Sequence, residues 1–171
     1  MIIYEDTRQQ AGKHCAKHKW FSAHGIELVQ RKLDFGDYAV DGSNIVIDTK
    51  KGLLEIAGNI GREHDRFARE CIRAYEQGYR LIILIETREC STIADVAGWT
   101  NTNCRQCGYY LLSMCKVIHE RCLRYKRHPM TGDTLSRTMA TFESHYHCRF
   151  EFCDPLRSAR RICELLGVAY E

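Results

Sequence analysis

The chain has 171 residues, of which 44% are hydrophobic and 27% charged, and its formal net charge is +3. This length fits one domain, residues 1–171, with a core of its own, and the composition is typical of a globular protein rather than a disordered or fibrous one. The longest apolar run, residues 81–85, is far too short to span a bilayer, and the N-terminus lacks the pattern of a signal peptide. We therefore expect a cytoplasmic protein with no membrane partner.

The first half of the chain predicts strands that alternate with helices. A strand over Ile2–Asp6 is followed by a helix over residues 13–24, which Gly25 would terminate, and by a strand over residues 26–31. After a hairpin, the pattern predicts two helices and then a strand that is buried on both faces. These three segments cover residues 53–60, 63–77 and 80–86.

The predicted β-hairpin carries the most chemistry. Its arms are residues 33–40 and 45–50, with a polar turn between them. Because side chains alternate along a strand, Asp48 and Lys50 share one face, and Asp37 on the partner arm lies within reach of it. Adjacent carboxylates repel unless a cation neutralises them, and a lysine suits a negatively charged transition state. The set is typical of metal-assisted phosphodiester cleavage; a solvated surface ion pair is the alternative interpretation.

The end of the chain returns to a regular pattern. A helix is predicted over residues 134–146, a strand over residues 148–153, and a last helix from Pro155 that ends at Gly167. Strands alternating with helices predict an α/β fold with a mixed central sheet flanked by helices. Residues 98–132 interrupt this pattern, and we interpret them as an insertion rather than a second domain.

This insertion is rich in cysteine and basic side chains. The chain has ten cysteines and no secretion signal, so we expect them to be free thiols or metal ligands. Between residues 104 and 137 there are seven Lys or Arg residues against two acidic ones, which would attract a phosphate backbone or form a solvated loop. A structural zinc knuckle, with His119 as a substitute ligand, and ordinary free cysteines are both open for the four clustered thiols. Those four are Cys104, Cys107, Cys115 and Cys122.

Several short motifs follow one another along the chain: Asp6-Thr7-Arg8, Gly36-Asp37-Tyr38, Ile47-Asp48-Thr49-Lys50, Glu55 with the helix after it, Arg66-Phe67-Ala68-Arg69-Glu70-Cys71, and the strand over residues 81–86. In this order they resemble the XPF-type nuclease domain, the structure-specific endonuclease branch of the PD-(D/E)xK superfamily. The resemblance covers residues 1–89 well and residues 133–167 more loosely. It implies a restriction-endonuclease-like α/β core.

The resemblance also implies an activity, that of a divalent-metal-dependent endodeoxyribonuclease acting on branched or flapped DNA in recombination, repair or phage DNA processing. Asp37 and Asp48 would bind Mg²⁺ or Mn²⁺, and Glu55 would be a further ligand or a support. Lys50 would position the attacking water or stabilise the charged phosphorane. The expected substrate-binding residues are Asp6 and Arg8 at the edge of the cluster, Arg66 on the following helix, and Lys126 and Arg127 in the basic insertion.

The chain departs from the family pattern at several positions. Asp48 stands where the family usually has Glu, Gln9 where the opening motif has Glu, and Glu70 where it has Gln, which adds a negative charge. Glu55 lies one residue later than the family spacing. Eukaryotic relatives grip DNA with tandem helix-hairpin-helix modules, and nothing after Gly167 would form one. We therefore expect the basic insertion, a partner protein or a homodimer through the last two helices to hold the DNA.

Two other functions remain open on the sequence. One is a catalytically inactive nucleic-acid-binding module on a nuclease scaffold, against which the intact Asp37, Asp48 and Lys50 argue. The other is an RNA-processing enzyme, because the same catalytic fold can cut RNA and no motif here reads the 2′-hydroxyl. The lone nuclease domain suits a bacterial cell or a phage-infected host.

Overall fold

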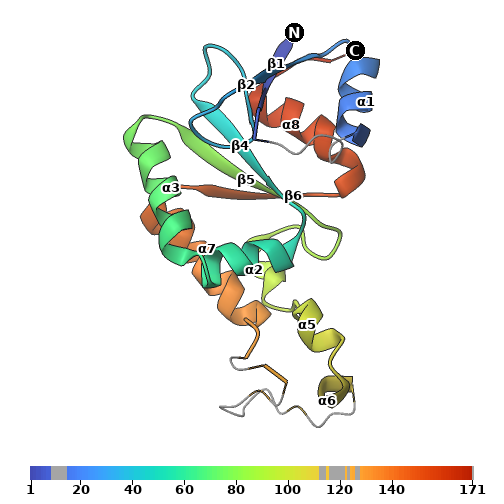
Figure 1. Ribbon diagram of the computed structural model, residues 1–171, viewed down its shortest axis with the longest axis vertical. Coiled ribbons are helices and arrows are strands. Elements are labelled where there is room, and N and C mark those ends of the chain that lie inside the picture. The colour runs from blue at the N-terminus through green and yellow to red at the C-terminus, as the bar shows by residue number, and fades with distance from the viewer. Residues whose placement is uncertain (9–14, 112–114, 116–121, 123, 126–127, 171) are drawn as a thin grey trace.

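A computed structural model describes residues 1–8, 15–111, 115, 122, 124–125 and 128–170 (Figure 1). Over these residues the chain forms a six-stranded sheet with the strand order β2-β1-β3-β4-β5-β6. The strands are β1 (Ile2–Asp6), β2 (Glu27–Arg31), β3 (Tyr38–Ala39), β4 (Ile45–Lys50), β5 (Arg80–Glu86) and β6 (Arg149–Cys153). The helices are α1 (Cys15–Ala23), α2 (Leu53–Gly61), α3 (His64–Glu76), α4 (Ile93–Val96), α5 (Thr102–Arg105), α6 (Gly108–Leu111), α7 (Gly132–Tyr146), the 3₁₀ turn η1 (Pro155–Arg157) and α8 (Ser158–Leu166).

The sheet is mixed, as the sequence predicts. The strand β3 is antiparallel to both of its neighbours, β1 and β4, whereas the pairs β1–β2, β4–β5 and β5–β6 are parallel. The strands β1, β4, β5 and β6 therefore all end at one edge of the sheet, and β3 begins there. We call this the carboxyl edge. Open α/β sheets place their functional residues at such an edge, because the loops that follow parallel strands meet there.

Helices cover both faces of the sheet and create two hydrophobic cores. Figure 1 shows α2, α3 and α7 against one face and α1 and α8 against the other. Alternation along β5 supplies both cores, because Ile83 and Ile85 point into the first and Ile82 and Leu84 into the second. This confirms the prediction of a strand buried on both faces. Against them pack Phe67 and Phe142 in the first core, and Phe21 and Ile162 in the second.

The last two long helices lie on opposite faces of the sheet. The buried residues of α7 include Leu135, Met139 and Phe142, and those of α8 include Ile162 and Leu166. Packing in the two cores accounts for both apolar stripes. The apolar residues of these helices therefore give no support for a homodimer, which stays a prediction.

The first arm of the hairpin is shorter than predicted. Only Tyr38 and Ala39 pair with β4, whereas the sequence predicts an arm over residues 33–40. The reason is Gly36, whose φ of +66° turns the backbone away from an extended path. A Cβ at this position would lie 2.7 Å from the Ile47 carbonyl oxygen, so the tight approach to β4 requires glycine.

The remaining predicted elements match with small shifts. The residues before Cys15 in the first predicted helix lie outside the described residues. The predicted last helix begins with the 3₁₀ turn Pro155–Arg157 and continues as α8. The Asp154 side chain caps this turn by accepting the Leu156 amide at 2.9 Å. In the described part of the chain, no helix is long and apolar enough to cross a membrane.

Candidate active site

Three of the predicted catalytic residues lie together at the carboxyl edge of the sheet. Asp48 and Lys50 lie at the end of β4, and Asp37 lies just before β3 begins. The Asp37 amide donates to the Ile47 carbonyl at 2.6 Å, and the Asp6 amide at the end of β1 donates to the Asp37 carbonyl at 2.8 Å. Three strands therefore fix the backbone of Asp37.

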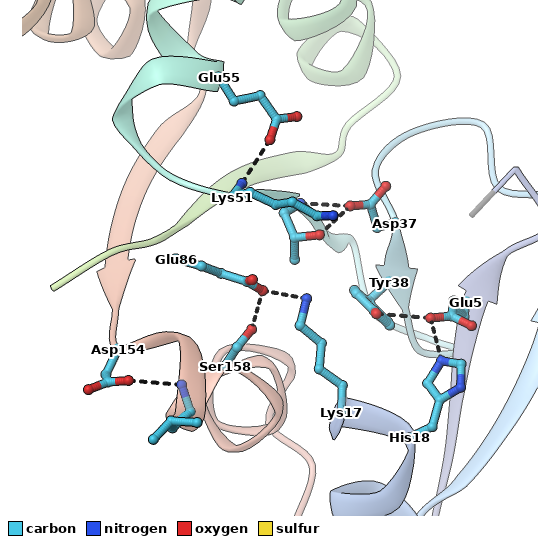
Figure 2. A network of polar contacts seen from close by, with 12 residues as sticks. Glu5, Lys17, His18, Asp37, Tyr38, Lys51, Glu55, Glu86, Asp154 and Ser158 are labelled. Carbon is cyan, nitrogen blue, oxygen red and sulfur yellow. Dashed lines mark hydrogen bonds and ion pairs between the residues drawn. The ribbon is translucent and has the colours of Figure 1, made fainter. Parts of the chain in front are cut away.

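Thr49 fixes the side chain of Asp37 (Figure 2). The Thr49 amide and hydroxyl both donate to Asp37 Oδ2, at 2.8 and 2.6 Å. Two donors on one oxygen hold the carboxylate in a single orientation. The middle residue of the Asp48-Thr49-Lys50 motif thus positions the carboxylate of the neighbouring strand.

Asp48 is a buried carboxylate beside a buried lysine. Lys50 Nζ lies 3.0 Å from Asp48 Oδ1 and 2.8 Å from Oδ2. The pKa of Asp48 is raised to about 7: burial contributes most, Asp37 and Glu70 add to the rise, and Lys50 opposes it. Burial acts to lower the pKa of Lys50, but the carboxylates of Asp48, Asp37 and Glu55 outweigh it and the net shift is upward. The lysine is therefore held as a cation.

Glu70 is a member of this cluster that the sequence prediction did not include. It lies on α3, and its charge raises the pKa of both Asp48 and Arg8. The sequence signal was present, because Glu70 stands where the family resemblance expects Gln. Only the packing of α3 on the sheet shows that this added charge faces the carboxyl edge.

Asp6 and Arg8 lie at the margin of the cluster. Asp6 is buried, and Arg8 Nε donates to its Oδ2 at 2.6 Å. The Arg8 guanidinium also donates to the Leu33 carbonyl at 2.9 Å. Asp6 raises the pKa of Arg8 most, and Glu70 and Asp37 add to the effect. Arg8 contacts the buried Asp6 and also reaches solvent, since its side chain is 63% exposed. It therefore connects the edge of the cluster to the protein surface.

Two predicted residues have other contacts. Glu55 accepts the Lys51 amide at 2.8 Å through Oε2, which ties the first turn of α2 to the segment that precedes it (Figure 2). Arg66 is exposed and forms an ion pair with Glu63 at the start of α3. Neither contact tests a role with metal or substrate. The predicted DNA contacts Lys126 and Arg127 lie outside the described residues.

The donor set of the carboxyl edge fits a hard divalent cation. Mg²⁺ and Mn²⁺ prefer oxygen ligands, and a buried carboxylate crowded by two others gains from a neighbouring positive charge. Among the described residues, no three His, Cys, Asp or Glu side chains gather closely enough to hold a metal ion by themselves. Two carboxylates, with water and phosphate oxygens completing the shell, match the way in which Mg²⁺ is commonly bound.

The other face of the sheet carries a second polar network (Figure 2). Its first carboxylate, Glu5, accepts the Tyr38 hydroxyl at 2.9 Å and lies 3.0 Å from His18 Nε2. Its second, Glu86, is paired with Lys17 and accepts the Ser158 hydroxyl at 2.5 Å. These contacts join α1, β1, β3, β5 and α8. Each carboxylate is surrounded by donors, so the network suits packing rather than metal binding.

Comparison with known proteins supports the fold. No family model matches the sequence, and no curated protein matches it significantly. The structure is similar to XPF from Aeropyrum pernix, with a TM-score of 0.60 and 17% sequence identity. The match covers 97% of this chain and 63% of the XPF chain, so this chain spans less than two thirds of its neighbour. The six-stranded mixed sheet flanked by helices is therefore an XPF-like fold of the restriction-endonuclease-like type.

Proposed function

We propose that this chain is a divalent-metal-dependent endonuclease that hydrolyses phosphodiester bonds in DNA. The observation that carries the proposal is the position of Asp48, which is buried, paired with Lys50 and crowded by Asp37 and Glu70. Like charges gathered in a buried place weaken a protein unless they serve a ligand. The resemblance to XPF-type nucleases, in sequence motifs and in fold, supports the same conclusion.

Each side chain has a separate task in this mechanism. Asp37, which is oriented by Thr49, and Asp48 would hold the cation. A bound Mg²⁺ or Mn²⁺ lowers the pKa of a water molecule and offsets phosphate charge. Lys50 places a fixed positive charge next to Asp48, where it stabilises the extra negative charge of the phosphorane. Glu55 supports the site by accepting the Lys51 amide and keeping Lys50 charged.

We extend the proposal to branched or flapped DNA as the substrate class. This step rests on the XPF resemblance and on the excess of Lys and Arg between residues 104 and 137. Recombination, repair or phage DNA processing would supply such structures.

The test is cleavage of labelled duplex, flap, fork and four-way DNA in Mg²⁺, Mn²⁺ or EDTA. We expect metal-dependent products from the wild type and at least about a 100-fold loss in Asp48→Asn, which removes the charge but keeps the shape. DNA binding should be retained, because the variant leaves the exposed basic residues in place.

Asp65→Asn is the matched control, since Asp65 is an exposed carboxylate on α3 that contacts His64. It should cut like the wild type. Equal cutting by Asp48→Asn would refute the site. DNA binding that ignores the metal, with no product under any condition, would favour the inactive binding module instead.

A further inference from the structure

The first two of the four clustered cysteines lie on or next to α5, away from the sheet (Figure 1). Figure 1 places α5 and α6 at the far end of the molecule from β1. The Cys107 amide donates to the Cys104 carbonyl at 2.9 Å, so the first two cysteines flank one tight turn. The Cys115 amide donates to the Tyr109 carbonyl at 2.9 Å, which folds the third cysteine back toward α6.

A residue that closely follows the fourth cysteine contacts the turn between the first two. Arg124 Nη1 donates to the Gln106 carbonyl at 3.1 Å, and Gln106 lies inside the turn between Cys104 and Cys107. The Tyr125 amide donates to Cys122 Sγ at 3.3 Å. Backbone amides that donate to sulfur stabilise a thiolate, because they place positive charge next to it.

The thiols of this segment are also electrostatic neighbours. Burial raises the pKa of Cys104, and Cys115, Cys122 and Cys107 raise it further, in that order. Cys104, Cys115 and Cys122 are free cysteines. Thiolates that influence one another in this way repel, and a cation with a preference for soft ligands would offset that repulsion.

Large side chains in the described part of this segment are exposed to solvent. Cys107 is buried, but Tyr109 is 43% exposed and Leu111 is 69% exposed. The helices α5 and α6 have four residues each, and single turns are unstable in water without tertiary support. A small, core-poor segment commonly gains its stability from a bound metal.

We propose that Cys104, Cys107, Cys115 and Cys122 bind one structural Zn²⁺ ion. The spacing of the first pair and the return of the chain through Arg124 suit a tetrahedral site of four thiolates. Within the described residues, no three ligating side chains lie close enough to hold a metal ion. Binding of the ion would therefore require the four sulfur atoms to move closer together. The role is structural, and it is independent of the cleavage that we propose for the carboxyl edge.

His128 is a neighbouring donor that tests the ligand set. With Cys104 it lines a pocket of about 200 Å³. Its Nδ1 lies 2.7 Å from the Pro129 carbonyl and therefore donates to it, which leaves Nε2 as an acceptor. In the described part of the chain, this buried Nε2 has no hydrogen-bond partner. We assign the ligands to the four thiolates and expect His128→Gln to keep the metal.

The experiment measures bound metal rather than activity. The intact chain is purified without chelator, and zinc per chain is measured by elemental analysis for the wild type, Asp48→Asn, Cys15→Ser, His128→Gln, Cys107→Ser and Cys122→Ser. We expect one zinc per chain in the first four proteins and its loss in the last two. Cys15, an exposed cysteine on α1, controls for cysteine replacement in general.

Cobalt gives a second readout that does not depend on the stability of the variants. Apoprotein titrated with Co²⁺ should develop the visible bands of a tetrahedral site and strong thiolate-to-cobalt charge transfer. A wild type with no zinc and no such bands would overturn the proposal. So would zinc that persists in Cys122→Ser or disappears in His128→Gln. Loss of zinc in Asp48→Asn would move the metal to the carboxyl edge and also refute the assignment.

Discussion

The two faces of the sheet hold carboxylates in opposite ways. On the face of α1 and α8, Glu5 and Glu86 each contact hydrogen-bond donors or a cation from neighbouring elements (Figure 2). At the carboxyl edge on the other face, Asp48 has Lys50 but also the repulsion of Asp37 and Glu70. A carboxylate surrounded by donors stabilises the fold, whereas one surrounded by like charges costs stability and is available to a ligand.

Tyr38 separates the two regions. Its side chain packs in the second core and donates to Glu5, while its backbone follows Asp37 directly. Burial raises its pKa, and the carboxylates of Glu5, Asp37 and Glu86 all add to the rise. One residue thus ties the catalytic edge to the stabilising network. The comparison predicts that substitutions in the Glu5 and Glu86 network and at the carboxyl edge will change the free energy of unfolding by different amounts and with different signs.

The largest effect on stability is expected from Lys17→Met. This change leaves the buried carboxylate of Glu86 without its cation, and we expect it to lower the free energy of unfolding by roughly 3 kcal/mol. Urea denaturation monitored by circular dichroism measures it. The double variant Lys17→Met/Glu86→Gln should recover part of the loss, because it removes the unpaired charge. A single variant as stable as the wild type would mean that the pair is not a stabilising contact.

A smaller loss is expected from Gly36→Ala. The added methyl group meets the Ile47 carbonyl, and alanine must also adopt a positive φ, so we expect a cost of about 1–3 kcal/mol. Gly42→Ala is the matched control, because Gly42 also has a positive φ but nothing within 4 Å of its Cβ position. Thermal denaturation of both variants separates the close approach from the backbone strain alone. Equal melting temperatures would show that β4 can yield.

The pH dependence of stability tests the crowding at Asp48. Its pKa rises from an ordinary 3.8 to about 7 in the fold, so the folded state binds the proton more tightly than the unfolded state between those values. Without a divalent cation, the free energy of unfolding should therefore fall as pH rises from 4 to 7, by at most roughly 1.4 kcal/mol per pH unit.

Asp48→Asn and added Mg²⁺ should each reduce this slope. The variant has no proton to lose, and the cation stabilises the charged carboxylate. Denaturation at a series of pH values, with and without Mg²⁺, measures both effects. A slope that is the same in the wild type and in Asp48→Asn would assign the pH dependence to other groups.

The smallest effect is expected at Glu55. Glu55→Gln keeps an oxygen that can accept the Lys51 amide, so we expect a change below about 1 kcal/mol and cleavage close to that of the wild type. Glu55→Ala removes the acceptor of the Lys51 amide and should cost about 1 kcal/mol. If Glu55→Gln lost cleavage as completely as Asp48→Asn, Glu55 would be a metal ligand rather than a support.

Strand bounds, and the faces on which neighbouring side chains lie, could be predicted from the sequence alone. Alternation along residues 45–50 placed Asp48 and Lys50 on one face, and the polar turn before them placed Asp37 opposite. The bounds of β1 and β5 agree with the prediction, since apolar periodicity and turn residues act over a few neighbouring positions. The start of the hairpin was predicted wrongly because one glycine, Gly36, overrides the extended pattern around it.

Which charged side chains contact one another could not be predicted from the sequence, because these contacts depend on how the elements pack. Glu70 reaches the cluster because α3 packs across the first face of the sheet, and Arg66 on the same helix pairs with Glu63 instead. The contact between Lys17 and Glu86 joins residues far apart in the chain. The spacing of apolar and polar residues predicts which face of its own helix or strand a residue occupies. It does not predict how two such elements are rotated relative to each other. That rotation is set by the packing of both cores at once, and it decides whether a carboxylate meets a lysine or another carboxylate.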